Sequence, residues 1–175
     1  PISLQFAGDV VKKDTELTIK NPIHLLSIDG IQCKILPSSN KTKFLDAYFI
    51  FDAGEEVTAY PLLKIKAKLG TIIDFGYSER LVSGKVIPTI DGVKYYDRYI
   101  CKEAEQEWIS WDWKAFRYMV LVIRNFNSEI ELDGVEYIQT GYPVSNIGSF
   151  YSSDTLLNKI WNTGKRTLNV NMHDT

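Results

Sequence analysis

The chain has 175 residues, with 20 Lys and Arg against 22 Asp and Glu, so its formal net charge is −2. Hydrophobic residues make up 45% and charged residues 24%, a composition typical of a globular domain and not of a disordered chain. The near-neutral charge argues against a strongly basic nucleic-acid binder, and every apolar run is far shorter than the roughly 20 residues that span a bilayer, so we expect neither nucleic acid nor a membrane as a partner.

The first forty residues contain short strand-like runs that end in a linker-like stretch. The runs are Ile2–Phe6, Leu17–Ile19, His24–Ile28 and Gln32–Leu36. Pro37-Ser38-Ser39-Asn40 follows them and has the composition of a linker. We therefore predict that residues 1–40 are the tail of a preceding β domain or linker strands.

The middle of the chain has the period of two that is typical of strands. From Leu63 to Lys68, apolar and cationic residues alternate, which predicts a half-buried antiparallel strand. Gly70 then turns the chain into a second alternating run that ends at Tyr77. The two runs together predict a hairpin.

Further strand-like runs follow without any helical period between them. They lie at 85–90, 93–101, 107–111, 116–124 and 130–138. Asp91-Gly92 and Asp133-Gly134 are turn signals, because glycine adopts positive φ without steric cost. Many short strands with turns between them predict an all-β fold, an antiparallel β-sandwich or jelly roll, over residues 41–146.

Three tryptophans lie close together at Trp108, Trp111 and Trp113. Such rings can stack on a sugar or fill a core. In a regular strand Trp111 and Trp113 share one face and Trp108 takes the other, so the three do not form one platform. We favour core packing and keep sugar contact through these tryptophans as the alternative.

Arg117 stands between two aromatic residues in an otherwise apolar strand. A cation in that position is expected to form a structural ion pair with a carboxylate, and removing one partner of a buried pair leaves an uncompensated charge. Asp52, Asp97 and Glu79 are the candidate partners.

Cys33 and Cys101 are too few for a disulfide framework, and neither lies in a zinc-binding spacing. We expect buried free thiols, and a single disulfide between them stays open. The sequence contains no recognisable nucleophilic triad, phosphate loop or metal-ligand cluster. We therefore expect no cofactor and no metal site in this chain.

After Gly148 the period becomes helical. Apolar residues fall on one side of the expected helix at Leu156, Leu157, Ile160, Trp161 and Leu168. Ser152, Ser153 or Asp154 can cap its first N–H groups. The apolar stripe needs a partner, so we predict that residues 147–175 are a linker and the first helix of a helical domain that continues beyond it.

Several short motifs, each weak alone, occur in a specific order. They are Phe51-Asp52-Ala53-Gly54, Gly70-Thr71, Tyr77-Ser78-Glu79, Asp97-Arg98-Tyr99-Ile100, Phe116-Arg117-Tyr118 and Gly148-Ser149-Phe150, followed by the Ser153-Asp154 helix start. In this order and spacing, the segment from Phe44 to Thr175 resembles the bacterial α-L-rhamnosidase family.

The resemblance implies a concanavalin-like β-sandwich that precedes a catalytic (α/α)-barrel. It also implies inverting hydrolysis of terminal α-L-rhamnosides by acidic residues of that barrel, so this chain should be inactive alone. The implied partners are the barrel of the same polypeptide and rhamnose-containing glycans, and such a role favours a periplasmic or secreted protein.

Two main hypotheses follow. The first is a non-catalytic sandwich that braces the barrel and contributes to the substrate cleft. The second is a free-standing carbohydrate-binding module, which requires an exposed tryptophan beside a polar group such as Asp112 or Lys114. A spacer without ligand contact is a third interpretation.

Overall fold

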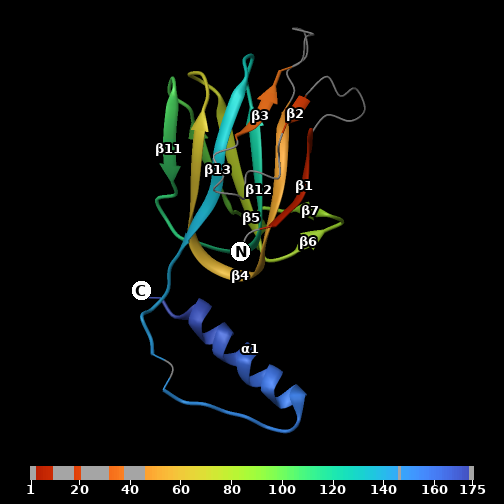
Figure 1. The fold of residues 1–175 in the computed structure, drawn as a ribbon, viewed down its shortest axis with the longest axis vertical. Coiled ribbons are helices and arrows are strands. Elements are labelled where there is room, and N and C mark those ends of the chain that lie inside the picture. Colours follow the sequence, from red (N-terminus) through yellow and green to blue (C-terminus); the bar gives the residue numbers. More distant parts are fainter. Residues whose placement is uncertain (1–2, 10–17, 21–31, 38–45, 146, 174–175) are drawn as a thin grey trace.

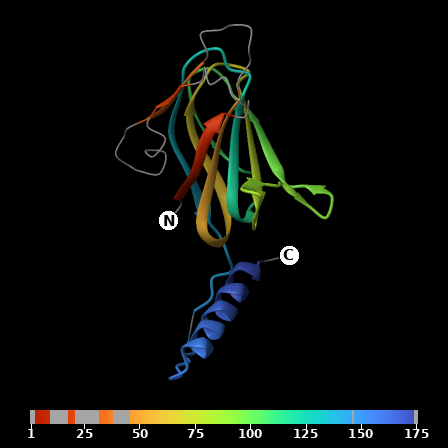
Figure 2. The ribbon, with the colours of Figure 1, turned by 90° about the vertical axis from the view of Figure 1, so that its right-hand side faces the viewer.

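The computed structural model describes residues 3–9, 18–20, 32–37, 46–145 and 147–173 (Figure 1). A β-sandwich occupies one end of the molecule, and a single helix, α1 (Thr155–Asn171), lies beyond its lower edge. The segment after the last strand leads away from the sandwich, and α1 returns toward it, so that the C-terminal end of the helix lies next to the strands (Figures 1 and 2).

The long or paired strands of the sandwich are β1 (Ser3–Asp9), β2 (Thr18–Lys20), β3 (Cys33–Leu36), β4 (Ala47–Lys66), β5 (Ile72–Ser78), β10 (Tyr96–Ile100), β11 (Glu105–Ile109), β12 (Lys114–Arg124) and β13 (Ile130–Gln139). Two small two-stranded sheets complete the described β-structure: β6 (Leu81–Val82) with β7 (Lys85–Val86), and β8 (Thr89–Ile90) with β9 (Val93–Lys94).

Strand β4 belongs to both layers of the sandwich because it bends at Gly54, where φ is +83°. Its first half pairs with β1 and with most of β12, and its second half pairs with β11, β13 and the first residues of β12. One layer therefore runs β1-β4-β12-β5-β10, and the other runs β11-β4-β13-β3-β2. The bend is visible as the turn at the lower edge of the sandwich in Figure 1.

The hydrophobic core lies between the two layers. The alternation predicted around Leu63 and Tyr77 is confirmed, because the apolar residues of both runs are buried. The largest fully buried side chains include Phe49, Phe51, Phe75, Tyr77, Phe116, Met119 and Leu121. Every strand pairing among the described residues is antiparallel, which confirms the predicted β-sandwich with one C-terminal helix.

Two local predictions were wrong. β4 and β5 do not pair as a hairpin, because β5 pairs with β10 and β12, and the turn at Gly70 carries the chain between layers. Asp133-Gly134 is not a turn, since β13 runs through it with a register shift between Leu132 and Gly134. Asp91-Gly92 does connect β8 with β9, and both of its residues have positive φ, as a tight hairpin turn requires.

The described part of residues 1–40 belongs to the sandwich, which corrects its assignment to a preceding domain or linker. β1 pairs with β4, and β3 pairs with β13 on one side and β2 on the other. Cys33 and Ile35 are fully buried in the core, which explains why this segment packs with the rest. The strand predicted at His24–Ile28 lies outside the described residues.

Cys33 and Cys101 are both buried free thiols. Burial raises the pKa of Cys33 to about 12 and that of Cys101 to about 11, because a desolvated thiolate is disfavoured. Neither thiol is ionised near neutral pH, so both act as small core residues.

Helix α1 begins where its cap was predicted. Asp154 accepts a hydrogen bond from the main-chain N–H of Leu156 at 2.8 Å. The predicted apolar stripe is present on the helix and stays exposed, and α1 has no buried residue. The helix is therefore held by contacts near its C-terminal half and not by burial of its apolar side.

Candidate functional site

The bend of β4 is organised around Asp52. Its Oδ1 accepts a hydrogen bond from the Gly54 N–H at 2.7 Å. Arg117 donates from Nε to Oδ1 at 2.8 Å and from Nη2 to Oδ2 at 3.1 Å, a bidentate pair. The guanidinium also lies 5.0 Å from the ring centroid of Tyr118. These contacts, the Arg117 hydrogen bonds above all, hold the pKa of Asp52 below its usual value.

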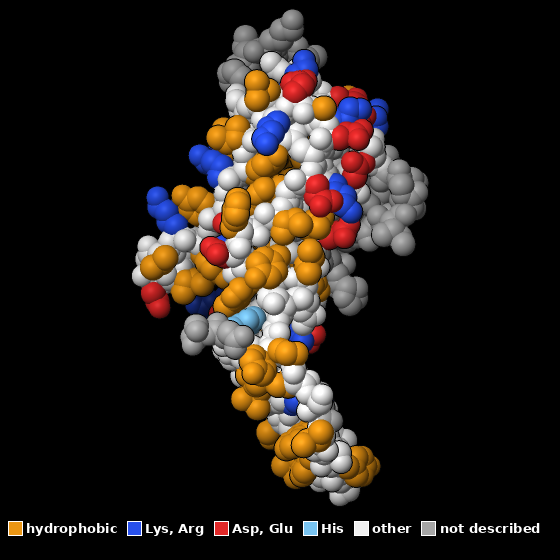
Figure 3. All heavy atoms as spheres, turned by 90° about the vertical axis from the view of Figure 1, so that its left-hand side faces the viewer, with side chains coloured by type: hydrophobic (Ala, Val, Ile, Leu, Met, Phe, Trp, Pro, Cys, Tyr) orange, Lys and Arg blue, Asp and Glu red, His pale blue; other side chains and the backbone are white. Residues whose placement is uncertain are grey.

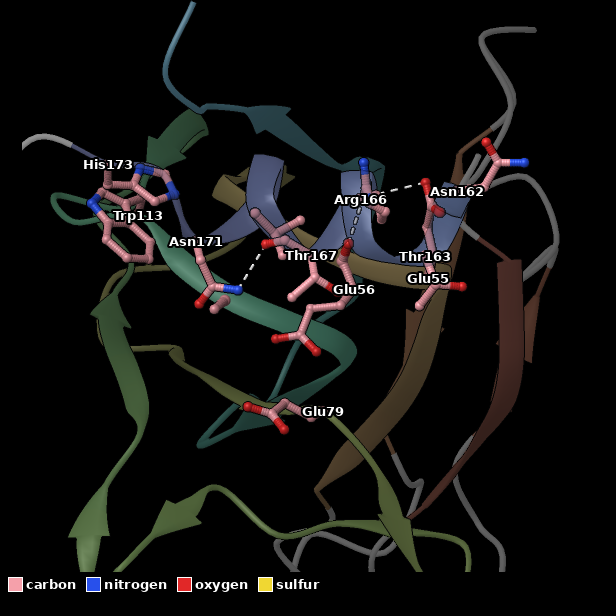
Figure 4. Close-up of a pocket in the computed structure, with 12 residues that line it drawn as sticks. Glu55, Glu56, Glu79, Trp113, Asn162, Thr163, Arg166, Thr167, Asn171 and His173 are labelled. Atoms are coloured by element: carbon pink, nitrogen blue, oxygen red, sulfur yellow. Dashed lines mark hydrogen bonds and ion pairs between the residues drawn. The ribbon is translucent and has the colours of Figure 1, made fainter. Parts of the chain in front are cut away.

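The other two carboxylates considered for Arg117 lie elsewhere. Asp97 Oδ2 accepts hydrogen bonds from the Tyr77 hydroxyl at 2.8 Å and from Ser110 Oγ at 3.1 Å, and Lys114 Nζ lies 3.4 Å from Oδ1. Burial and the Asp97 charge raise the pKa of Tyr77, so its hydroxyl remains a donor. Glu79 follows β5 and faces the helix side of the bend (Figure 4).

The tryptophans divide between core and surface. Trp108 stacks on Phe75 with ring centroids 4.8 Å apart and packs against the core, as favoured above. Trp111 is 94% exposed, so core packing was wrong for it. Trp111 and Trp113 lie in the loop between β11 and β12, where strand alternation does not apply. Trp113 stacks on His173 with centroids 4.0 Å apart.

A cleft of about 810 Å³ lies between the β4 bend, the start of β12 and the C-terminal half of α1 (Figure 4). The residues that line it include Glu55, Glu56, Glu79, Trp113, Arg166 and His173. Only Trp113 and Glu79 were singled out by the sequence analysis. The others come from segments more than a hundred residues apart and carry no motif of their own.

A set of contacts, here called the clamp, fastens α1 to the sandwich through Glu55, Glu56, Trp113, Arg166 and His173. Arg166 Nη2 donates to the main-chain oxygen of Glu56 and lies 3.2 Å from the Glu55 carboxylate. The stacking of His173 on Trp113 adds a second attachment further along the chain, just past the end of the helix. The clamp fixes the C-terminal end of α1 against the β4 bend.

The cleft also holds two carboxylates outside the clamp. Neither the Glu56 carboxylate nor that of Glu79 has a hydrogen-bond donor or cation in contact among the described residues. Burial raises the pKa of Glu56, the Glu79 charge adds to this, and Arg166 opposes it. Figure 4 shows both side chains on the sandwich side of the cleft, opposite α1.

Replacing Arg166 with methionine should loosen α1 without unfolding the sandwich. The substitution keeps the aliphatic stem and removes the charged hydrogen bond, a loss of about 1 kcal/mol for a partly exposed pair. Amide exchange in the last turns of α1 should become roughly fivefold faster, measured by hydrogen–deuterium exchange. Lys165→Met, at an exposed neighbouring position, is the control, and equal exchange in both variants would contradict the clamp.

The far side of α1 is apolar and exposed. A groove of about 1080 Å³ runs along it, lined by Ile147, Leu156, Ile160, Trp161 and Leu168 among others. Figure 3 shows hydrophobic side chains gathered along the lower part of the molecule, beyond the sandwich. A contiguous apolar surface of this kind marks an interaction site.

Within the described ranges, no group of three or more His, Cys, Asp or Glu side chains is placed to hold a metal ion. The described helix is too short and too polar to cross a membrane.

Comparison with known proteins gives a consistent result. Residues 42–140 match the family described as the bacterial alpha-L-rhamnosidase concanavalin-like domain. The chain is 28% identical over 173 residues to an alpha-L-rhamnosidase of Formosa agariphila, a match that covers 92% of this chain and 18% of that protein. The chain therefore spans less than a fifth of the length of this curated relative.

Two solved structures are similar. The GH78 family rhamnosidase of Bacillus sp. GL1 shares 33% identity with a TM-score of 0.69, over 80% of this chain and 14% of that chain. The rhamnosidase from Klebsiella oxytoca, solved with rhamnose bound, has a TM-score of 0.57 and 12% identity, over 99% of this chain and 36% of that chain. At that identity, the second likeness concerns the fold alone.

Proposed function

Because the chain belongs to the bacterial alpha-L-rhamnosidase concanavalin-like domain family, we propose that it is the β-sandwich that braces the catalytic helical domain of a larger glycoside hydrolase. The chain resembles the non-catalytic concanavalin-like domain of GH78 rhamnosidases, and it covers only 14% and 18% of two rhamnosidases that it matches. The substrate proposed for the larger protein is a terminal α-L-rhamnoside.

The observation that carries this proposal is that the two sides of α1 have different surroundings. One side is fastened to the β4 bend by the clamp, whereas the other side presents Leu156, Ile160 and Leu168 without a partner among the described residues. A helix of this kind can join two layers, because it is attached to one and still has apolar surface to bury against the other.

The proposal divides the chain by role. Residues 41–146 are the brace, together with the described strands β1 and β3 that pair with them and β2 that pairs with β3, and residues 147–175 are the linker and the first helix of the helical domain. The catalytic carboxylates then belong to that helical domain, as the family resemblance implies. The clamp supports a brace that sets the angle between the two parts.

The test is hydrolysis of an aryl α-L-rhamnoside by the complete gene product and by this chain at matched concentration. The complete product should be active and this chain inert, because the acids lie outside it. Activity of this chain alone would overturn the non-catalytic role, and inactivity of both would overturn the substrate assignment.

One observation favours a second candidate, the carbohydrate-binding module. Trp111 is 94% exposed and stands next to Asp112, the arrangement that this alternative requires. A glycan-binding screen of the chain and of its Trp111→Ala variant tests it. Retention on a glycan that disappears in the variant would support the module, and equal behaviour of both proteins would contradict it.

A further inference from the structure

The outer face of β11, β4 and β13 is charged at the end that lies far from the β4 bend. Lys64 and Lys66 of β4 point outward there, because alternate residues of a strand share a face and the residues on either side of Lys64 are buried. Lys66 Nζ lies 3.0 Å from the Glu131 carboxylate, and Lys64 Nζ lies 3.5 Å from that of Glu136. These partly exposed ion pairs keep this end of the face polar.

Closer to the bend, the same face becomes apolar. The strand register places Ile109 of β11 beside Leu62 of β4, and Ile138 of β13 beside Tyr60. Ile109 and Ile138 are exposed, and Trp111, which follows β11, is 94% exposed. These five residues are here called the outer patch. Figure 3, which faces the β11 side of Figure 1, shows hydrophobic side chains gathered on this face of the sandwich. An exposed apolar surface of this kind marks an interaction site.

The loop that carries Trp111 is fastened at both ends. The N–H of Ser110 donates to the main-chain oxygen of Pro61 at 3.0 Å, and Ser110 Oγ lies 3.1 Å from Asp97 Oδ2. At the other end of the loop, Lys114 Nζ lies 3.4 Å from Asp97 Oδ1. The ring of Trp111 is therefore exposed on a loop that is already positioned. An anchor that is ordered before binding loses little conformational entropy on burial, and tryptophan is among the residues enriched at binding hot spots.

The chemistry of the outer patch fits a protein surface better than a small ligand. A small-molecule site is concave and has a few polar groups that converge on the ligand. The outer patch is a sheet face with the Tyr60 hydroxyl as its one polar side-chain group besides the Trp111 indole N–H, and Trp111 lines neither the cleft nor the groove along α1. Contacts between protein surfaces combine an aromatic and aliphatic centre with a polar rim, and the ion pairs of Lys64 and Lys66 supply such a rim here.

The outer patch is continuous with the clamp. Trp113, two residues after Trp111, stacks on His173 just past the end of α1. On the other side of the patch, β13 leads to Tyr142, whose N–H donates to the main-chain oxygen of Met172 at the C-cap of α1, at 3.1 Å. Figure 3 shows hydrophobic side chains on this face of the sandwich and along the lower part of the molecule in one view, so a single body can cover both.

We propose that the outer patch, with Trp111 as its anchor, is a docking surface for the helical domain that the proposed function places after α1. A domain that packs on the exposed apolar side of α1 and on the outer patch encloses the clamp between two contacts. Naming this surface deepens the proposed function and rests on it, because the occupant is the same helical domain. The role given to Trp111 differs from that in the binding-module alternative, where the ring contacts a glycan.

The first test measures how fast hydroxyl radicals oxidise the Trp111 ring, followed by mass spectrometry, in the complete gene product and in this chain. Trp111 should be oxidised about tenfold more slowly in the complete product, because an anchor at the centre of an interface is shielded from water. Tyr96, which is 43% exposed on β10 in the other layer, is the control and should react equally in both proteins. Equal oxidation of Trp111 in both proteins would overturn the proposal.

The same measurement separates the helical domain from other occupants of the outer patch. Protection of Trp111 in the complete product should be unaffected by dilution, because the contact lies within one polypeptide. Protection that disappears on dilution would indicate a second copy of the protein. Protection that appears only after an aryl α-L-rhamnoside is added would indicate sugar contact, and either result would overturn the docking of the helical domain.

The second test compares Trp111→Ala with Tyr96→Ala by hydrogen–deuterium exchange. In the complete product, amide exchange over residues 136–144 should become about fivefold faster in Trp111→Ala and stay unchanged in Tyr96→Ala, because only the first variant loses a docking anchor. In this chain, Trp111→Ala should leave exchange over the same residues unchanged, since the ring is exposed there. Equal exchange in the two variants of the complete product, or an equal increase in this chain, would show that Trp111 anchors no second domain.

The two proposals can fail separately. Oxidation of Trp111 needs no enzymatic activity, whereas the assigned reaction is judged by hydrolysis with the complete gene product. An active complete product in which Trp111 is oxidised as fast as in this chain would remove only the docking surface. An inert complete product in which Trp111 is protected at every dilution would instead remove the assigned hydrolysis and support the docking surface.

Discussion

Replacing Arg117 with methionine should destabilise the sandwich by about 2–4 kcal/mol. Asp52 is only 6% exposed, and after the substitution its carboxylate would keep the Gly54 N–H and the Tyr118 side chain but lose both hydrogen bonds from the charged Arg117. Breaking a buried pair by removing one partner costs more than the pair contributes, because the remaining charge is uncompensated. Arg117 itself is partly exposed, so the loss should fall below that of a fully buried pair.

Urea unfolding of Arg117→Met, Asp52→Asn and the double variant measures this pair in a double-mutant cycle. The double variant should be less destabilised than the sum of the single variants, since it leaves no unpaired charge. Lys64→Met, which breaks the exposed pair of Lys64 with Glu136, is the control and should cost less than about 0.5 kcal/mol. Similar losses for Arg117→Met and Lys64→Met would show that the bend does not depend on the Asp52 pair.

The same pair gives stability a definite pH dependence. The folded pKa of Asp52 lies below its usual 3.8, so the unfolded chain takes up a proton first as pH falls. The contribution is complete above the unfolded pKa and is lost as pH falls through the folded value. Glu56 acts oppositely, because its folded pKa is raised above 4.5 and its ionisation lowers stability as pH rises. Unfolding of Asp52→Asn and Glu56→Gln between pH 3 and 7 should separate the two slopes.

Local patterns in the sequence predicted local structure well. The alternation around Leu63, the buried face ending at Tyr77 and the helix capped near Asp154 each depend on neighbouring residues, and all three are present. The Asp91-Gly92 turn is also local and was found. In these cases the repeat and its turn or cap residues lie close together in the sequence, whereas the Asp133-Gly134 signal was equally local and did not form a turn.

Features set by pairing between distant strands were not predictable. The bend at Gly54 places Tyr118 opposite Asp52 and Phe116 opposite Val57, and this jump in register brings Arg117 to Asp52 and not to Asp97. Three carboxylates were candidate partners of Arg117 from the sequence, and no local pattern distinguished among them. The strands that pair with β5 and the register shift in β13 were mispredicted for the same reason. A turn signal in the sequence does not specify which strands pair on either side of it.

The cleft was missed for a related reason. The Glu55-Glu56 pair reads as an ordinary exposed turn, and Arg166 contacts it across 110 positions of sequence. The cleft has one local signal in the sequence, Asp52-Ala53-Gly54 followed by two acids. This signal indicates a bend in the chain, but it does not indicate which segment packs against the bend. Trp113 was considered as part of a regular strand, whereas in the structure it lies in the loop between β11 and β12.

The second large effect is expected from Phe116→Ala. Phe116 is 1% exposed and lies where β12 passes from one half of β4 to the other. Its ring centroid is 5.4 Å from that of Tyr77 in one layer and 6.2 Å from that of Tyr137 in the other, so it links both layers beneath the bend. Removing it should cost about 3–5 kcal/mol through lost burial and the cavity left behind.

For a chain of this length, that loss corresponds to a fall in Tm of roughly 10 °C, measurable by calorimetry. Trp111→Ala is the matched control, because it deletes a larger ring that is 94% exposed and should change stability by no more than about 0.5 kcal/mol. If the two variants lost similar stability, the ring of Phe116 would not be joining the layers. A large loss for Phe116→Ala alone would show that its ring holds the two layers together beneath the bend, the same part of β4 to which α1 is clamped.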